Sequence, residues 1–351
     1  MRTAWPVSRV WRVIAMVTVT GMLAASATAC GAGGGDAPAN GLVLYNGQHE
    51  QTTQALVHAF EQQTGINVTI RNGDEATLAA QITQEGSRSP ADVFYTENSQ
   101  PLMKLAGEHL LAPTAKATLA AVPAKYSSPA GNWVGVSARV SALVYNTSGL
   151  KPAQLPSSVM DLAKPEWAGK LGIAPGETDF QPIITSIADT YGSSAALAWL
   201  KAVKSNAGSH NYQDNETLVS EVNSGQVQIG LINHYYWYRL QAQLGAGKAH
   251  SALHYFAAGD AGYVLDVSGA GILASSSHKA AAQKFLSFLV STAGQRVIAQ
   301  TDSYEFPLRP GVPAHPGLPA LSSLHPDPAD TIARLGDGST ALQFLQQAQL
   351  G

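Results

Sequence analysis

Short apolar runs alternate with helical patterns along most of this chain, and that alternation constrains the fold more than any other feature. Residues 42–45 and 66–70 are apolar runs of strand length. Between them, residues 51–64 have helical periodicity, with Leu56 and Phe60 on one face. The pattern then repeats. It predicts βαβ units around a largely parallel sheet, and therefore an α/β fold.

Two later stretches, residues 133–145 and 262–273, are long, extended patterns rich in Val, Ser and Gly, without helical periodicity. Strands this long, far apart in the sequence, are able to cross between two lobes as a hinge, and a second set of α/β signals lies between them. We predict two mixed sheets flanked by helices and joined by crossing hinge strands. The expected lobes are residues 41–140 with 266–308, and 141–265 with 309–351.

The first residues follow the order of a secretory signal. Arg2, Arg9 and Arg12 precede an apolar run at 13–25, and small residues follow. The run is shorter than the roughly 20 apolar residues of a membrane span. We predict a signal peptide at residues 1–29 and an exported protein.

Cys30 is the only cysteine, so an internal disulfide and a thiolate metal cage are both excluded. Its position after Ala27-Thr28-Ala29 is similar to a bacterial lipobox, although that motif usually has leucine where Ala27 stands. Residues 31–40 are Gly-rich and suit a tether. We predict lipidation at Cys30, hence anchoring to the outer face of the cytoplasmic membrane. The alternative is simple cleavage there.

Loss of the signal peptide removes three arginines and no acidic residue, so the net charge of −3 becomes −6. A negative chain is a poor partner for nucleic acid or an anionic membrane surface. About 310 residues remain, which is enough for two lobes of ordinary domain size.

Three polar clusters each follow a predicted strand: residues 46–50, 96–98 and 233–238. In open α/β sheets, ligands bind beyond the carboxyl ends of strands, so these clusters predict a shared cleft. Each also has an ordinary explanation. His49 and Glu97 are possible helix caps, and an aromatic pair such as Tyr235 and Tyr236 more often packs in a core.

Six short sequences together resemble the bacterial ferric-ion-binding proteins, also called bacterial transferrins, which have the periplasmic binding protein fold. The resemblance runs in unchanged order from about Gly41 to Val312, which makes it far more specific than one motif. The matching sequences are YNGQHE at 45–50, SPADVFYTE at 89–97, WVGVS at 133–137, VYNT at 144–147, LINHYYW at 231–237 and YEFPL at 304–308.

The resemblance implies four Fe³⁺ ligands: His49, Glu97, Tyr235 and Tyr236. This set is chemically coherent, because hard cations prefer oxygen donors. Tyrosine has a pKa near 10, so only a strongly polarising ion deprotonates two of them at neutral pH. Adjacent strand residues face opposite sides of a sheet, so we expect the tyrosines in the first turn of the following helix.

The resemblance also implies a bound anion, such as phosphate, that completes the coordination. Glu177 and Asp179 depart from the family, which commonly has small neutral residues in this loop. The two carboxylates either point to solvent, repel the anion, or take its place, and we favour the last two. We therefore expect iron binding to depend weakly on anions. The residues that match or approximate the anion site are Asn98, Thr178, Asn215 and Asn233.

These expectations describe a monomeric extracytoplasmic binding protein that captures ferric iron between its lobes and delivers it to an ABC permease. Two alternatives stay open. One is a binding protein of the same fold for a polyamine, a sugar or thiamine, with the aromatic cluster as a stacking surface. The other is a hydrolase, but the sequence has no Gly-x-Ser-x-Gly elbow, no His-Glu-x-x-His helix and no phosphate loop.

Overall fold

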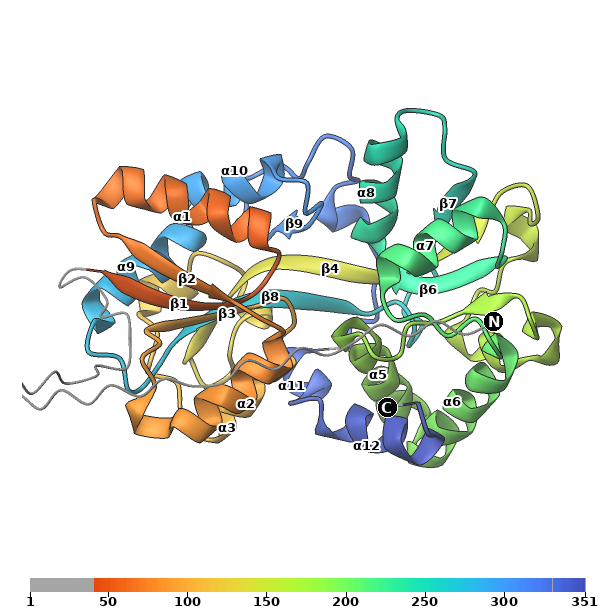
Figure 1. Cartoon of the computed structure of the whole chain (residues 1–351), viewed down its shortest axis with the longest axis horizontal. Helices are drawn as coiled ribbons and strands as arrows, with labels where there is room; N and C mark the ends of the chain where they lie inside the picture. Colours follow the sequence, from red (N-terminus) through yellow and green to blue (C-terminus); the bar gives the residue numbers. More distant parts are fainter. Residues whose placement is uncertain (1–40, 330, 351) are drawn as a thin grey trace, which may run out of the picture. The chain divides into compact units, whose positions relative to one another are not determined.

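The computed structural model describes residues 41–329 and 331–350 (Figure 1). The predicted signal peptide, the lipidation site at Cys30 and the Gly-rich tether lie outside the described residues. Within the part that is described, no helix has the length and apolar character needed to cross a bilayer.

The first half of the sheet is built from the predicted βαβ units, with strand order β2-β1-β3-β8-β4. β1 runs parallel to β2 and β3, and β8 joins antiparallel, so the sheet is mixed, as predicted for the lobes, rather than largely parallel as the alternating pattern alone indicated. α9 and α10 pack against α1. The strands are β1 (Leu42–Gly47), β2 (Val68–Asn72), β3 (Val93–Thr96) and β8 (Leu265–Ile272), and the helices are α1 (Glu50–Thr64), α2 (Glu75–Glu85), α3 (Gln100–Gly107), α4 (Lys116–Leu119), α9 (Lys279–Leu289) and α10 (Thr292–Gln300).

The long strand β4 (Trp133–Asn146) belongs to both halves of the sheet, and every residue in it is buried. Residues 133–140 pair with β8, and residues 141–146 pair with β6 and β7. This confirms the first predicted crossing strand. The second predicted crossing strand, residues 262–273, is longer than the observed β8. The chain enters the first half of the sheet just before β8, where the Ser141 N–H donates to the Val264 carbonyl oxygen at 2.9 Å.

The second half of the sheet continues through β6 and β5, with β7 on the other side of β4. The last two helices pack against α5, and α12 also contacts α6, which brings the end of the chain to this half (Figure 1). Its elements are β5 (Leu171–Gly172), β6 (Ile229–Asn233), β7 (Ser251–His254), α5 (Gln181–Tyr191), α6 (Ser193–Ala207), α7 (Asn215–Ser224), α8 (His234–Leu244), α11 (Ile332–Leu335) and α12 (Ser339–Ala348); β9 (Phe306–Pro307) pairs with the first half of β4.

Local sequence signals explain where several of these helices begin and end. Asp74 caps α2 by accepting the Thr77 N–H at 2.8 Å, and Asp214 caps α7 in the same way. Such a cap satisfies one of the free N–H groups in the first helical turn. α1 ends at Gly65, whose φ of 70° is a left-handed conformation that glycine adopts without strain.

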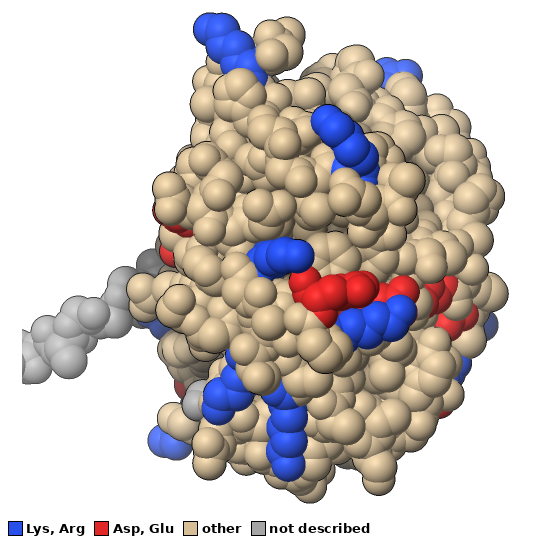
Figure 2. Space-filling model, turned by 90° about the vertical axis from the view of Figure 1, so that its right-hand side faces the viewer, with Lys and Arg blue, Asp and Glu red and all other residues tan. Residues whose placement is uncertain are grey.

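Figure 2 shows the end of the molecule where the second half of the sheet lies, and this face carries few charges. Most of it is uncharged, and the basic and acidic side chains lie interspersed rather than in one field. Among the described residues on this face, there is no continuous basic surface of the kind that binds a polyanion.

Candidate metal centre

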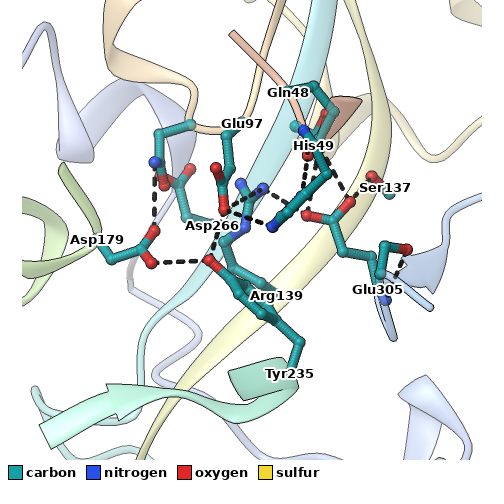
Figure 3. A network of polar contacts seen from close by, with 12 residues as sticks. Gln48, His49, Glu97, Ser137, Arg139, Asp179, Tyr235, Asp266 and Glu305 are labelled. Carbon is teal, nitrogen blue, oxygen red and sulfur yellow. Dashed lines mark hydrogen bonds and ion pairs between the residues drawn. The ribbon is translucent and has the colours of Figure 1, made fainter. Parts of the chain in front are cut away.

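Three of the four side chains expected to bind metal, those of His49, Glu97 and Tyr235, meet at one point (Figure 3), and the Tyr236 hydroxyl reaches the same place through Asp179. His49 directly precedes α1, Glu97 follows β3, and the tyrosines come from α8 in the other half of the sheet. His49 Nε2 lies 3.4 Å from Glu97 Oε1, and the Tyr235 hydroxyl donates to the same oxygen at 2.5 Å. One nitrogen and several oxygens from distant parts of the sequence therefore converge.

The adjacent tyrosines lie in the first turn of α8, as predicted. β6 ends at Asn233, and the chain turns directly into the helix, so the two rings lie side by side with centroids 4.3 Å apart. Both hydroxyls point the same way. Tyr235 and Tyr236 donate to one acceptor, Asp179 Oδ2, at 2.8 Å and 3.0 Å.

Asp179 is a fourth acidic or phenolic side chain at this point, and it is buried. The possibility that both carboxylates of this loop point to solvent is therefore wrong for Asp179. Its other oxygen, Oδ1, lies 3.3 Å from Asn98 Nδ2. Glu177 is only partly buried, so the two acidic residues of the loop have different positions. The sequence showed the departure from the family but did not distinguish them.

Burial and neighbouring charge shift the pKa values of His49, Asp179 and the two tyrosines. Burial, together with the positive charge of Arg239, lowers the pKa of His49 to about 3, so its imidazole is neutral at neutral pH. Burial and the charge of Glu97 raise the pKa of Asp179 to about 6. Burial and the charge of Asp179 raise the pKa of Tyr235 and Tyr236 well above the ordinary value for tyrosine. Without a metal, these phenols keep their protons.

The residues expected to bind an anion lie near the centre, but the protein itself uses or buries their polar groups. Asn98 Nδ2 donates to Glu75 Oε1 at 2.9 Å and to Thr178 Oγ1 at 3.0 Å, so protein oxygens already use this amide. Asn215 and Asn233 are both buried. Asn215 and Asp179 line a cavity of about 10 Å³. A cavity of that size holds at most about one water molecule, and phosphate is larger.

The buried carboxyl group of Glu75 holds the loop that carries Glu97. Glu75 Oε2 accepts the N–H groups of Glu97 and Asn98, both at 2.9 Å. Burial and the charge of Glu97 raise the pKa of Glu75 to about 8. Glu75 is the first residue of α2, where an acidic residue is common, so its sequence position gave no sign of this role.

The sequence analysis also missed an ion pair behind the centre. His49, Glu97 and Glu305 each offer a ligand atom within 4.8 Å of one another. Glu305 is paired with Arg139, whose Nη2 lies 2.5 Å from Glu305 Oε1. One signal was visible in the sequence, because Arg139 is the only charged residue of β4.

A larger cavity of about 410 Å³ adjoins the centre. His49 and Tyr236 form part of its wall, together with Glu216 and Arg239. Of the four side chains expected to bind metal, this cavity therefore reaches His49 and Tyr236.

Comparison with known proteins identifies the family. Residues 42–301 match the family described as bacterial extracellular solute-binding protein. The chain is 40% identical over 311 residues to the Fe(3+)-binding periplasmic protein of Serratia marcescens, covering 89% of this chain and 90% of that protein. It is 34% identical over 309 residues to the major ferric iron-binding protein of Neisseria gonorrhoeae, covering 88% and 92%.

Solved structures agree with the fold. Iron-bound HitA from Pseudomonas aeruginosa superposes with a TM-score of 0.82 at 40% identity, covering 88% of this chain and 99% of that one. Trichodesmium IdiA (FutA), in complex with iron and citrate ligands, gives 0.76 at 27% identity, covering 89% and 100%. With its mixed sheet, shared strand and two halves, this chain has the type II periplasmic binding protein fold and belongs to the bacterial extracellular solute-binding protein family.

Proposed function

We propose that this protein binds ferric iron through His49, Glu97, Tyr235 and Tyr236 and delivers it to an ABC permease for uptake. The observation that carries the proposal is the convergence of an imidazole, a carboxylate and the Tyr235 phenol from both halves of the sheet, with the Tyr236 phenol joined to them through Asp179. The relatives named as ferric-binding proteins, at up to 40% identity over most of the chain, support the same cargo.

The chemistry of these donors favours Fe³⁺ over softer or less charged metals. Oxygen donors suit hard cations, and the two tyrosines bind as phenolates only to an ion that displaces their protons. With Glu97 and Asp179 ionised, the site supplies four negative charges and one neutral imidazole. Thiolates are not available, since Cys30 is the only cysteine and precedes the fold.

Delivery requires export and lobe movement. We propose that residues 41–140 with 266–308 form lobe 1 and that residues 141–265 with 309–351 form lobe 2, with iron closing the cleft between them. Lobe 1 then supplies His49 and Glu97, and lobe 2 supplies the tyrosines. Cleavage after residue 29, lipidation at Cys30 and the tether at 31–40 would hold a monomer near its permease on the outer face of the membrane.

Asp179 takes the place of an exogenous anion in this proposal. Its Oδ2 accepts from both tyrosine hydroxyls, so it lies where an ion bound to both phenolates also meets a carboxylate. Its negative charge opposes a second anion at the same point. Iron affinity should therefore change little when phosphate and carbonate are removed.

The anion proposal is tested with Asp179→Ala and, as a matched control, Glu177→Ser in the same loop. We expect Asp179→Ala to lose iron affinity and to regain part of it with added phosphate, whereas Glu177→Ser behaves like the unmodified protein. If the unmodified protein releases iron when these anions are rigorously removed, an exogenous anion is part of the site and the proposal fails.

The ligand assignment is tested with three tyrosine variants on one helix. Tyr235→Phe and Tyr236→Phe should each weaken iron binding strongly and reduce the red-orange phenolate-to-iron absorption, measured against a competing chelator. Tyr238→Phe is the control, because its ring stacks on Tyr304, 5.7 Å away, behind the centre. An equal loss in all three variants would indicate a packing effect and refute the assignment.

An organic solute stacked on the tyrosines is the weaker alternative. The Tyr235 ring is already surrounded, by His49 at 5.2 Å, by Tyr236 at 4.3 Å and by the Arg239 guanidinium at 4.8 Å. It therefore has no free face for a second ring. Protein that stays colourless with ferric citrate but binds a polyamine, a sugar or thiamine in calorimetry would favour this alternative.

A further inference from the structure

A chain of buried hydrogen bonds runs behind the metal centre from Arg139 to His49 (Figure 3). It begins with the ion pair of Arg139 and Glu305, which are 1% and 0% exposed. Ser137 Oγ also donates to Glu305. A guanidinium and a hydroxyl therefore both donate to Glu305, whose two oxygens act as hydrogen-bond acceptors.

The charge of Glu305 determines which way the Gln48 amide points. Gln48 Nε2 lies 3.2 Å from Glu305 Oε2 and 2.8 Å from Ser268 Oγ. Ser268 uses its own proton on the Thr96 carbonyl oxygen, at 2.7 Å, so it accepts from Gln48. Both neighbours on this side need a donor, which fixes the amide nitrogen toward them. The amide oxygen of Gln48 must then face the other way.

The oxygen of Gln48 faces His49 and determines its tautomer. Gln48 Oε1 accepts the His49 backbone N–H at 2.7 Å and is in short contact with His49 Nδ1. An amide oxygen only accepts, so the imidazole proton is on Nδ1. The lone pair is then on Nε2, the nitrogen that faces Glu97 at 3.4 Å. This is the nitrogen that a metal at the centre would bind.

The segment around Glu305 is itself held tightly. Tyr304 has a φ of 52°, a conformation that a bulky residue adopts only when its surroundings enforce it. Its carbonyl oxygen accepts from His234 Nε2 at 2.9 Å, and the Phe306 ring stacks on His234 with centroids 4.8 Å apart. His234 directly precedes Tyr235. This segment therefore contacts Gln48, the neighbour of His49, and His234, the neighbour of Tyr235.

We propose that Glu305 and Gln48 are positioning residues of this centre, which orient His49 and keep the proton off the nitrogen that binds iron. The inference rests on the proposed function. Glu305 is not a ligand in this proposal, because Arg139, Ser137 and Gln48 already use its two oxygens. Outer partners of this kind commonly affect metal affinity about 10–100-fold.

The test is Gln48→Met, which is similar in size but neither accepts from His49 nor donates to Glu305. In metal-free protein with ¹⁵N-labelled histidine, long-range ¹⁵N–¹H correlation should show His49 protonated on Nδ1. Gln48→Met should move population to the Nε2-protonated form and lower iron affinity about 10–100-fold. The control is Gln54→Met, an exposed position on α1, the helix that follows Gln48, and it should change neither quantity.

A double-mutant cycle with His49→Ala separates positioning from a general structural effect. If Gln48 acts through His49, Gln48→Met costs no further affinity in the His49→Ala background. An equal loss in both backgrounds overturns the proposal. So does an Nε2-protonated His49 in the unmodified protein, or a tautomer shift without loss of affinity. The tautomer measurement needs no iron, so failure of the iron-binding function and failure of this inference are distinguishable.

Glu305→Gln tests the next step of the chain. It removes the charge that orients Gln48, so both His49 tautomers should be populated and iron affinity should fall. Unchanged tautomer and affinity in a folded Glu305→Gln protein would overturn the role of Glu305. If this variant does not fold, because Arg139 is left buried without its partner, the Gln48 cycle decides.

Discussion

Iron affinity should fall steeply on acidification, with a slope that counts the protons on the tyrosines. The pKa values of Tyr235 and Tyr236 are raised well above 10, so both phenols are protonated in the metal-free protein at neutral pH. Iron must displace both protons. The logarithm of the binding constant then changes by about two per pH unit, or about 2.7 kcal/mol at about 1.36 kcal/mol for each proton.

The slope should steepen below the raised pKa of Asp179, about 6. Above that pH, Asp179 is already ionised, so iron displaces no proton from it. Below it, the metal-free protein carries a third proton that iron must displace, so the slope approaches three. His49, with a pKa lowered to about 3, adds nothing until the pH is far lower. All these protons favour the metal-free protein, so affinity decreases as pH decreases.

The assay is competition between the protein and a chelator whose own proton dependence is known, followed through the phenolate-to-iron absorption between about pH 5 and 8. Tyr236→Phe is the matched variant and should lower the slope by one at every pH. This difference removes protons common to both proteins, including those of Glu75 and Glu177, whose pKa values are raised to about 8. Equal slopes for the two proteins would refute phenolate binding by Tyr236.

Three further measurements test the fold and its movement. Small-angle scattering should give a smaller radius of gyration with iron than without it, and identical profiles would contradict lobe closure. Gly135→Ala should destabilise the protein by about 1–3 kcal/mol in chemical denaturation, because its Cβ would collide with the Tyr126 carbonyl oxygen; an unchanged midpoint would show that the strand shifts freely. Asp74→Ala should cost about 1 kcal/mol through loss of the α2 cap, and no loss would mean that solvent replaces the cap.

Much of the fold was predictable because it rests on local periodicity. The helix predicted from the periodicity of residues 51–64 differs from α1 by one residue at its start, and the apolar run at 42–45 lies within β1. β7 was missed because it has four residues and is mostly half-buried. α10 was missed because only Val297 and Ile298 among its nine residues are large and apolar, although Ser291 caps it.

The metal centre was predictable only where the short sequences that resemble the family include its residues. His49, Glu97 and the tyrosine pair came from that resemblance, and the structure brings them together. The pairing of Arg139 with Glu305 joins positions 166 residues apart. No periodicity reports such a pairing, since it depends on where β4 and the segment after α10 meet in space.

The hydrogen bonds of the metal-free centre suggest how iron and protons exchange there. Glu97 and Asp179 are two carboxylates that would repel each other if nothing lay between them. The Tyr235 hydroxyl contacts both, at 2.5 Å and 2.8 Å, so one phenolic proton is shared by the pair. Arg139, whose Nη2 lies 3.9 Å from Glu97, adds a fixed positive charge nearby.

In this arrangement, the phenolic protons, like iron, prevent repulsion between negatively charged oxygens. Removing the phenolic protons without supplying a cation would leave up to four negative charges in contact, which burial makes costly. Supplying Fe³⁺ removes that cost and the protons together. Acidification reverses the exchange without requiring any ligand to move far, because protonated Tyr235 and Tyr236 already hydrogen-bond to Asp179. Proton uptake should therefore precede lobe opening on release. After a jump to low pH, stopped-flow absorption should show loss of the phenolate-to-iron band before time-resolved small-angle scattering shows any change in the radius of gyration. Opening before loss of colour would show that lobe movement, rather than protonation, breaks the site.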